Sequence, residues 1–246
     1  MTWLPNLATD APLWLALLTV GVNAVVGALR GQSDEQRHWD IVGISVFAVL
    51  MGLGGGFIRD LLIGNLPAES LRSPWFVVAV LAAIGLVVLV GPHLVHVAPV
   101  MTLLNALALG LFAVSGTAYA LRAGLPAVSS VLVGTVAAVG GGMLVSVMQN
   151  EVPGILLAGA PHALLAVLAS TVYAITAVGN PRVAAVAAIA VAIAAQYLVD
   201  WLGLRTQPAK TPASVLLTRA PGRAPAGPAA SPRSEDQGDA EPGSSS

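Results

Sequence analysis

Leu53-Gly54-Gly55-Gly56-Phe57-Ile58-Arg59-Asp60 is the stretch that decides the fold, because it places three consecutive glycines inside a long apolar segment. Later in the chain, Val139-Gly140-Gly141-Gly142-Met143-Leu144 does the same. A proline follows the last glycine at the same distance in both stretches, Pro67 in the first and Pro153 in the second. Each glycine weakens a helix by about 1 kcal/mol relative to alanine, so the triplets predict two broken helices at matching places.

The composition of the chain is that of a membrane protein. Hydrophobic residues make up 56% of it and charged residues only 9%, whereas about a quarter of an ordinary soluble domain is charged. We therefore expect membrane lipids around it. A net charge of -1 gives no basic surface, so no nucleic-acid partner is expected. The chain has no cysteine and no cluster of metal-ligating residues, and no cofactor is predicted.

Seven apolar segments are long enough to cross a hydrocarbon core of about 30 Å. They run over residues 12–29, 41–65, 75–91, 99–120, 126–149, 161–178 and 183–203. The residues ahead of the first segment include no Lys or Arg, so we expect a retained helix there rather than a signal peptide. Residues 204–246 are rich in Pro, Ala, Gly and Ser and contain no aromatic residue, which predicts a disordered tail.

The two halves of the chain match beyond the glycine triplets. The matching stretches are Gly21-Val22-Asn23-Ala24-Val25-Val26-Gly27 with Gly110-Leu111-Phe112-Ala113-Val114-Ser115-Gly116, and Ala79-Val80-Leu81-Ala82 with Ala166-Val167-Leu168-Ala169. Short matches of such common residues also arise by chance, but their shared order favours duplication. We predict an all-α integral membrane protein with a three-helix repeat at 12–91, a second at 99–178 and a seventh helix at 183–203. Because three is odd, the second repeat is inverted.

The broken helices predict a path for a monovalent cation. Carbonyls that end a half-helix carry partial negative charge and can replace water around an ion such as potassium. Inverted symmetry brings Gly140, Gly141 and Gly142 to the depth of the first triplet, so that two sets of carbonyls face one path. The alternative is that the glycines only let the two helices cross closely. Three glycines in a row favour the path, since close packing needs small residues spaced along one face.

Arg59 and Asp60 form an adjacent charged pair near membrane depth. Neighbours in sequence point about 100° apart on a helix, so the two are not expected to neutralise each other face to face. We expect Arg59 to find carbonyls at the second break, and Asp60 to cap the second half-helix or to face the water path. The alternative is a pair that snorkels to the interface and anchors the helix.

These features together resemble the prokaryotic branch of the trimeric intracellular cation channel family, over roughly residues 12–203. The same sequences have also been labelled as a glycine transporter domain. The resemblance implies a homotrimer in which each protomer has its own pore between the kinked second and fifth helices. It implies potassium as the main permeant ion, and a place in the inner membrane of a bacterium.

Two positions depart from the pattern that the resemblance implies. Many relatives carry a second Arg-Asp pair where this chain has Val145-Ser146, and often an aspartate where it has Asn105. Ser146 and Asn105 are therefore candidate path residues of a less acidic pore.

Two other function classes stay open. A secondary transporter of a small solute such as glycine is the alternative, because transporters share inverted repeats with broken helices. An intramembrane enzyme is a third hypothesis, although no nucleophile with a base and an orienting group is evident.

The orientation follows from the basic residues outside the spans. With the N-terminus outside, the cytoplasmic segments carry Arg30, Arg37, Arg205, Lys210 and Arg219, against Arg72, Arg122 and Arg182 outside. This bias predicts an external N-terminus and a cytoplasmic C-terminus, with dual insertion left open.

Overall fold

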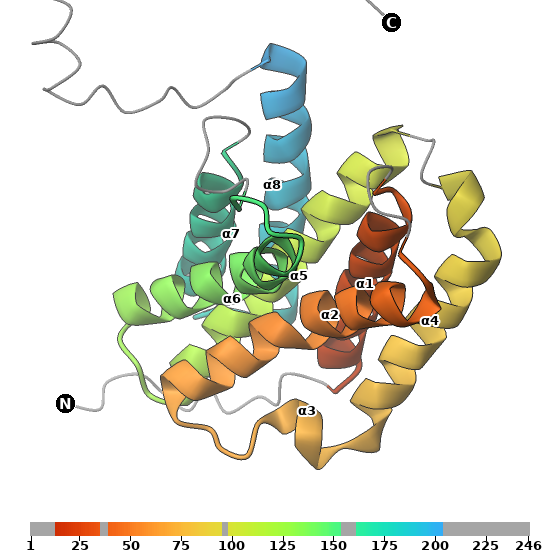
Figure 1. Ribbon diagram of the computed structural model, residues 1–246. Coiled ribbons are helices and arrows are strands. Elements are labelled where there is room, and N and C mark those ends of the chain that lie inside the picture. The colour runs from red at the N-terminus through yellow and green to blue at the C-terminus, as the bar shows by residue number, and fades with distance from the viewer. Residues whose placement is uncertain (1–12, 35–38, 95–97, 154–160, 204–246) are drawn as a thin grey trace, which may run out of the picture. The chain divides into compact units, whose positions relative to one another are not determined.

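The computed structural model describes residues 13–34, 39–94, 98–153 and 161–203, and within these ranges the regular structure is entirely helical. The helices are α1 (Leu13–Gln32), α2 (Ile41–Ile63), α3 (Glu69–Arg72), α4 (Pro74–Leu94), α5 (Ala98–Arg122), α6 (Ala127–Met148), α7 (His162–Thr176) and α8 (Pro181–Leu202), shown in Figure 1. The tail predicted to be disordered, residues 204–246, lies outside the described residues.

Six of these helices, α1, α2, α4, α5, α6 and α8, are long and apolar enough to span a membrane. The sixth predicted span, residues 161–178, is shorter than predicted. Its helix α7 has 15 residues, which gives about 22 Å at 1.5 Å per residue. It begins after Pro161, and Asn180 caps the next helix by accepting hydrogen bonds from the backbone of Arg182 and Val183. The four-residue helix α3 was not predicted either.

The helices that carry the glycine triplets are not broken, so that prediction is wrong. α2 runs without interruption through Gly54, Gly55 and Gly56, and α6 does the same through the second triplet. An unbroken helix keeps the backbone N–H and C=O groups paired, which the bilayer demands. The glycines serve instead to bring α2 and α6 into close contact, and the two lie side by side in Figure 1.

The contact between α2 and α6 is reciprocal. A Cβ atom placed on Gly55 would collide with the carbonyl oxygen of Ala137, and one on Gly141 would lie 2.7 Å from the carbonyl oxygen of Met51. The two contacts are equivalent in the repeat, because Gly55 corresponds to Gly141 and Met51 corresponds to Ala137, each 86 positions later. The same offset links the flanking contacts. A Cβ on Gly54 would lie 2.7 Å from Leu144 Cδ1, and one on Gly140 would lie 2.6 Å from Ile58 Cδ1.

The ends of α2 and α6 repeat the same turn. Gly64 follows α2 with φ of 72°, and Asn150, 86 positions later, has φ of 53°. The next backbone amide then reaches back to the helix in each case: Asn65 N donates to Asp60 O at 2.8 Å, and Glu151 N donates to Ser146 O at 2.9 Å. This is the Schellman type of helix end, in which a left-handed residue closes the last turn.

Each triplet helix packs against the first helix of its own half. α1 contacts α2 and α4, α5 contacts α6 and α7, and the two groups meet through α1 with α5 and α2 with α6. A Cβ on Gly27 would collide with the carbonyl oxygen of Phe47, and one on Gly116 would lie 2.7 Å from Gly134 Cα. The matching contacts support the predicted internal repeat, while its inverted insertion stays a prediction.

Candidate functional site

The last turns of α2 bury a charged pair. Arg59 is 5% exposed and Asp60 is fully buried. Two charges in such surroundings are costly unless each finds several partners. They face α5 and the short connection that contains α3, and both elements supply partners.

Arg59 is held by four side chains. Its Nε and Nη2 both lie 2.8 Å from Asp60 Oδ1, Nη2 lies 3.3 Å from Glu69 Oε2, and Nη1 donates to Ser115 Oγ at 3.2 Å. The guanidinium carbon also stands 3.7 Å from the centre of the Tyr119 ring, a cation–π contact. The prediction that Arg59 and Asp60 cannot neutralise each other is wrong, because the arginine side chain is long enough to fold back onto its neighbour. The carbonyl groups of the second triplet, which were the predicted partners of Arg59, belong instead to the unbroken helix α6.

Asp60 joins α2 to α3. Its second carboxylate oxygen, Oδ2, accepts a hydrogen bond from the backbone N–H of Glu69 at 2.8 Å. Glu69 is the first residue of α3, so the aspartate binds the start of this short helix rather than a second half of α2. Because the Glu69 side chain also binds Arg59, α3 is tied to α2 at two points.

Sequence reasoning missed Glu69 and Tyr119. Glu69 lies in the connection between α2 and α4. It is ten residues after Arg59 in the chain, so helical spacing could not predict that the two side chains meet. Tyr119 lies on α5, and no spacing in the sequence marked it as a partner of Arg59.

A small cavity of mixed lining lies beside this cluster. It has a volume of about 20 Å³, enough for one water molecule. Polar groups or bare backbone from α1, α2, α3 and α5 line part of it, and apolar side chains line the rest: Thr19, Gly56, Arg59, Glu69, Ser70 and Ser115 in the first set, and Ala16, Val20, Leu53, Phe76 and Phe112 in the second. A Cβ on Gly56 would meet nothing within 4 Å, so the last glycine of the first triplet faces open space.

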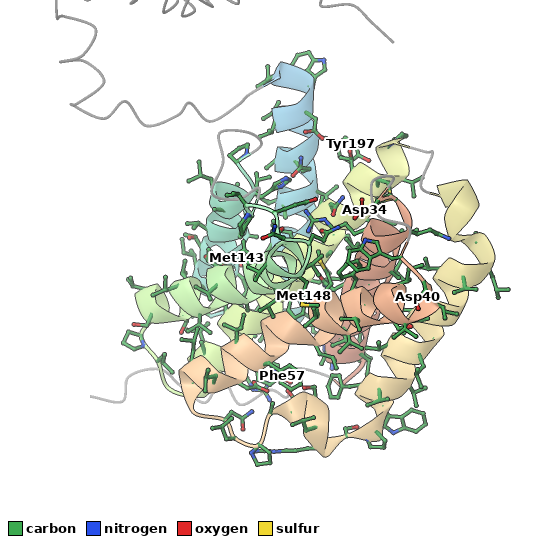
Figure 2. All side chains as sticks on the ribbon, viewed as in Figure 1. Asp34, Asp40, Phe57, Met143, Met148 and Tyr197 are labelled. Atoms are coloured by element: carbon green, nitrogen blue, oxygen red, sulfur yellow. The ribbon has the colours of Figure 1, made fainter. Side chains whose placement is uncertain are left out.

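A second polar cluster lies at the other triplet. A Cβ on Gly142 would lie 3.7 Å from Arg30 Nη1, so an arginine of α1 reaches α6. Ser146 is buried one turn further along, and the next turn carries Gln149, whose Nε2 donates to Asp34 Oδ2 at 3.4 Å. Figure 2 labels Asp34, and it labels Phe57 and Met143, which occupy equivalent places next to the two triplets.

The structure brings most of the predicted site residues together. The triplets meet at the crossing of α2 and α6, with Arg59 and Asp60 beside one and Ser146 beside the other. Asn105 does not join them, because it is exposed on α5 and its amide donates to the carbonyl oxygen of Met101 at 2.8 Å.

Comparisons with known proteins agree with this architecture. The family model described as "Glycine transporter" matches residues 13–92 and 102–178. A UPF0126 membrane protein of Deinococcus radiodurans is 33% identical over 143 residues, which are 58% of this chain and 65% of that protein. The UPF0126 membrane protein YvgT of Bacillus subtilis is 29% identical over 173 residues, 68% of this chain and 82% of the relative.

Solved structures are similar over most of the chain. The trimeric intracellular cation (TRIC) channel orthologue from Rhodobacter sphaeroides superposes with a TM-score of 0.70 at 27% identity, covering 80% of this chain and all of that one. A second TRIC channel, from work on conductance, gives the same TM-score and identity over 82% of this chain and 98% of its own. This multi-pass membrane protein therefore belongs to the glycine transporter (UPF0126) family and has the fold of the TRIC channels.

Proposed function

We propose that this protein is a potassium-conducting cation channel of the bacterial cell membrane, with one ion path inside each protomer. The observation that carries the proposal is the cluster of buried Arg59 and Asp60 with the partly exposed Glu69, beside a small cavity, in a chain with the fold of cation channels. Charged groups inside a membrane protein are expensive and often mark substrate or ion pathways.

The path runs beside the helix crossing rather than through it. Gly55 and Gly141 face the opposite helix at backbone contact, which leaves no passage between them. Gly56 faces the cavity, and Gly142 faces Arg30. In this proposal the ion path follows the crossing from the cluster at the first triplet to the cluster at the second, with the bare glycine backbone as one wall.

The oxygen atoms of the first cluster suit a cation. Asp60 and Glu69 offer carboxylate oxygens, and their two negative charges are balanced by Arg59 and by Arg122, whose guanidinium carbon lies 5.0 Å from the centre of the Tyr119 ring. The cavity volume also suits a potassium ion, which is about as large as a water molecule.

A carrier of glycine is the second candidate, favoured by the description of the family model. A glycine zwitterion is larger than a cavity with room for one water molecule, and it needs partners for both an ammonium and a carboxylate. Channel function therefore fits the site better. The relatives and neighbours named above are described as membrane proteins and channels, in keeping with a protein that is not an enzyme.

We infer a homotrimer with three separate paths. The support is the fold shared with channels described as trimeric, together with a face of exposed apolar side chains on most of the spanning helices. Native mass measurement in detergent or lipid discs is expected to give three copies. A stable monomer or dimer would contradict this assembly.

Single-channel recording of the purified protein in a planar bilayer tests the function. We expect discrete currents that reverse at the potassium equilibrium potential and disappear when N-methylglucamine replaces potassium. The matched experiment measures labelled glycine uptake into liposomes from the same preparation. Saturable glycine uptake without unitary currents would make the protein a carrier and end the channel proposal.

A further inference from the structure

We propose that the short helix α3 is a lid over the cavity beside Gly56, and that the side chain of Glu69 is the latch that holds this lid closed. The inference rests on the proposed function and deepens it, because the lid gates one end of the ion path. Glu69 and Ser70 of α3 line the cavity together with residues of α1, α2, α4 and α5. Of the helices that form this lining, α3 is the shortest.

The position of α3 depends on its contacts with other elements. It has four residues, and isolated helices shorter than about 12 residues are unstable in water. The residues that it contributes to the cavity wall, Glu69 and Ser70, are polar, and its large apolar side chain, Leu71, is already 68% exposed. Movement of α3 away from the cavity therefore exposes little further apolar surface, which is the main cost of such a movement.

Asp60 holds the start of α3 and serves as the pivot. Its Oδ2 accepts a hydrogen bond from the backbone N–H of Glu69 at 2.8 Å, and this bond fixes only the first residue of the helix. The next residue does not add to the attachment, since the buried hydroxyl oxygen of Ser70 has no hydrogen-bond partner among the described residues. Water that enters when the lid opens can hydrogen-bond to this hydroxyl.

The Glu69 carboxylate supplies the contacts that close the lid. Its Oε2 lies 3.3 Å from Arg59 Nη2, and the hydroxyl of Tyr119 donates a hydrogen bond to the same carboxylate. Together these contacts tie α3 to α2 and to α5. The side chain of Glu69 is 28% exposed, so water can replace its partners when it lets go.

The latch can open without leaving Arg59 unpaired. Arg59 keeps Asp60, whose Oδ1 lies 2.8 Å from both Nε and Nη2, and it keeps its hydrogen bond of 3.2 Å to Ser115. The costly step in breaking a buried ion pair is the charge that is left without compensation. That step does not arise when Glu69 leaves, because Asp60 stays in place.

Cysteine accessibility tests the lid, because the chain has no cysteine of its own. Ser70→Cys and Thr19→Cys each place a thiol at the cavity, one on the lid and one on α1. In the purified full chain in lipid discs, both thiols are expected to react slowly with a charged methanethiosulfonate reagent. Adding Glu69→Gln should raise both rates about tenfold, since a hydrogen bond between charged groups no longer favours the closed position.

Two controls separate an opened lid from a loosened protein. Ser130→Cys places a thiol at a fully buried site on α6, away from the cavity lining. Its rate should not respond to Glu69→Gln, and a rise as large as that of the cavity thiols would overturn the lid. Glu151→Gln, at an exposed site after α6, is the control substitution and should leave all three rates unchanged.

A second variant covers the case in which Glu69→Gln does not fold. Tyr119→Phe removes only the hydrogen bond that the hydroxyl gives to Glu69, and it keeps the ring against Arg59. The rates of the two cavity thiols should rise in the same direction. Unchanged rates in this variant would overturn the latch.

The outcomes separate the lid from the channel proposal. In planar bilayers, Glu69→Gln is expected to raise the open probability. Equal thiol rates with and without Glu69→Gln overturn the lid, whether or not the protein conducts. Faster reaction of the cavity thiols, with no currents from the wild type or from Glu69→Gln, supports the lid and overturns the channel. Faster reaction with an unchanged open probability overturns the gating role.

Discussion

At the scale of single residues, the charged cluster is a network in which each member has a different task. Asp60 neutralises Arg59 with one oxygen and binds the start of α3 with the other. Glu69 is the second carboxylate partner of Arg59, and the Tyr119 ring stacks on the guanidinium group. Buried pairs of this kind contribute little net stability when complete, but are costly to break, because one charge is then left without compensation.

Asp60→Asn tests this network. We expect the variant to lose about 3 kcal/mol of stability, because Arg59 keeps only the partly exposed Glu69 as a charged partner. Thermal unfolding in detergent gives the comparison. Ser146→Ala is the control, since Ser146 is equally buried at the equivalent position of α6 and bears no charge. Equal melting temperatures for the two variants would mean that the pair is not electrostatically coupled.

The sequence identified the pair but not its surroundings. Arg59 and Asp60 stand out as charges in an apolar stretch, so their importance is visible from composition alone. Their partners are not, because Glu69 lies beyond a turn and Tyr119 lies on another helix. The direction of a long side chain and the path of a connection depend on tertiary packing, on which helical periodicity carries no information.

At the scale of helices, the run of three glycines serves three purposes. Gly54 makes room for the side chain of Leu144, Gly55 for the backbone at Ala137, and Gly56 for the cavity. The sequence predicted the boundaries of most helices to within a few residues, but at the triplets it favoured an ion path and kept the close crossing as the alternative. It failed on the breaks, because the local cost of glycine was counted without the gain from close packing, which only the partner helix reveals.

Gly141→Ala tests the crossing. Its Cβ would lie 2.7 Å from the carbonyl oxygen of Met51 and 3.2 Å from the Cα of that residue, so α2 and α6 must separate. We expect a loss of about 1 to 3 kcal/mol, the usual cost of overpacking. Gly85→Ala on α4 is the control, because nothing lies within 4 Å of its added Cβ. It should be neutral or stabilising by up to about 1 kcal/mol, from helix propensity. A Gly141→Ala protein as stable as this control would show that the helices are not in backbone contact.

At the scale of the whole molecule, the predicted orientation decides which cluster an ion meets first. With the N-terminus outside, α1 ends at the cytoplasmic face, so Arg30 lies nearer the cytoplasm and Arg59 nearer the exterior. The charge bias that supports this orientation is small.

Cysteine labelling tests the orientation without background, because the chain has no cysteine of its own. In intact cells a membrane-impermeant maleimide is expected to label Thr2→Cys but not Ser246→Cys, and to label both after lysis. The reverse pattern would invert the orientation. Labelling of about half of each variant in intact cells would show insertion in both directions.

The ends of α2 and α6 share a backbone conformation that fits a common origin of the two halves. In the proposed duplication, Gly64 and Asn150 descend from one position, and both keep a left-handed backbone although the residue has changed. The charge near these ends differs between the halves, since Asp60 corresponds to Ser146, yet both triplets keep all three glycines. The two halves therefore share the positions that lack a side chain and the left-handed turn at the helix end. Their common origin is easier to recognise in this backbone geometry than in the chemistry of their side chains.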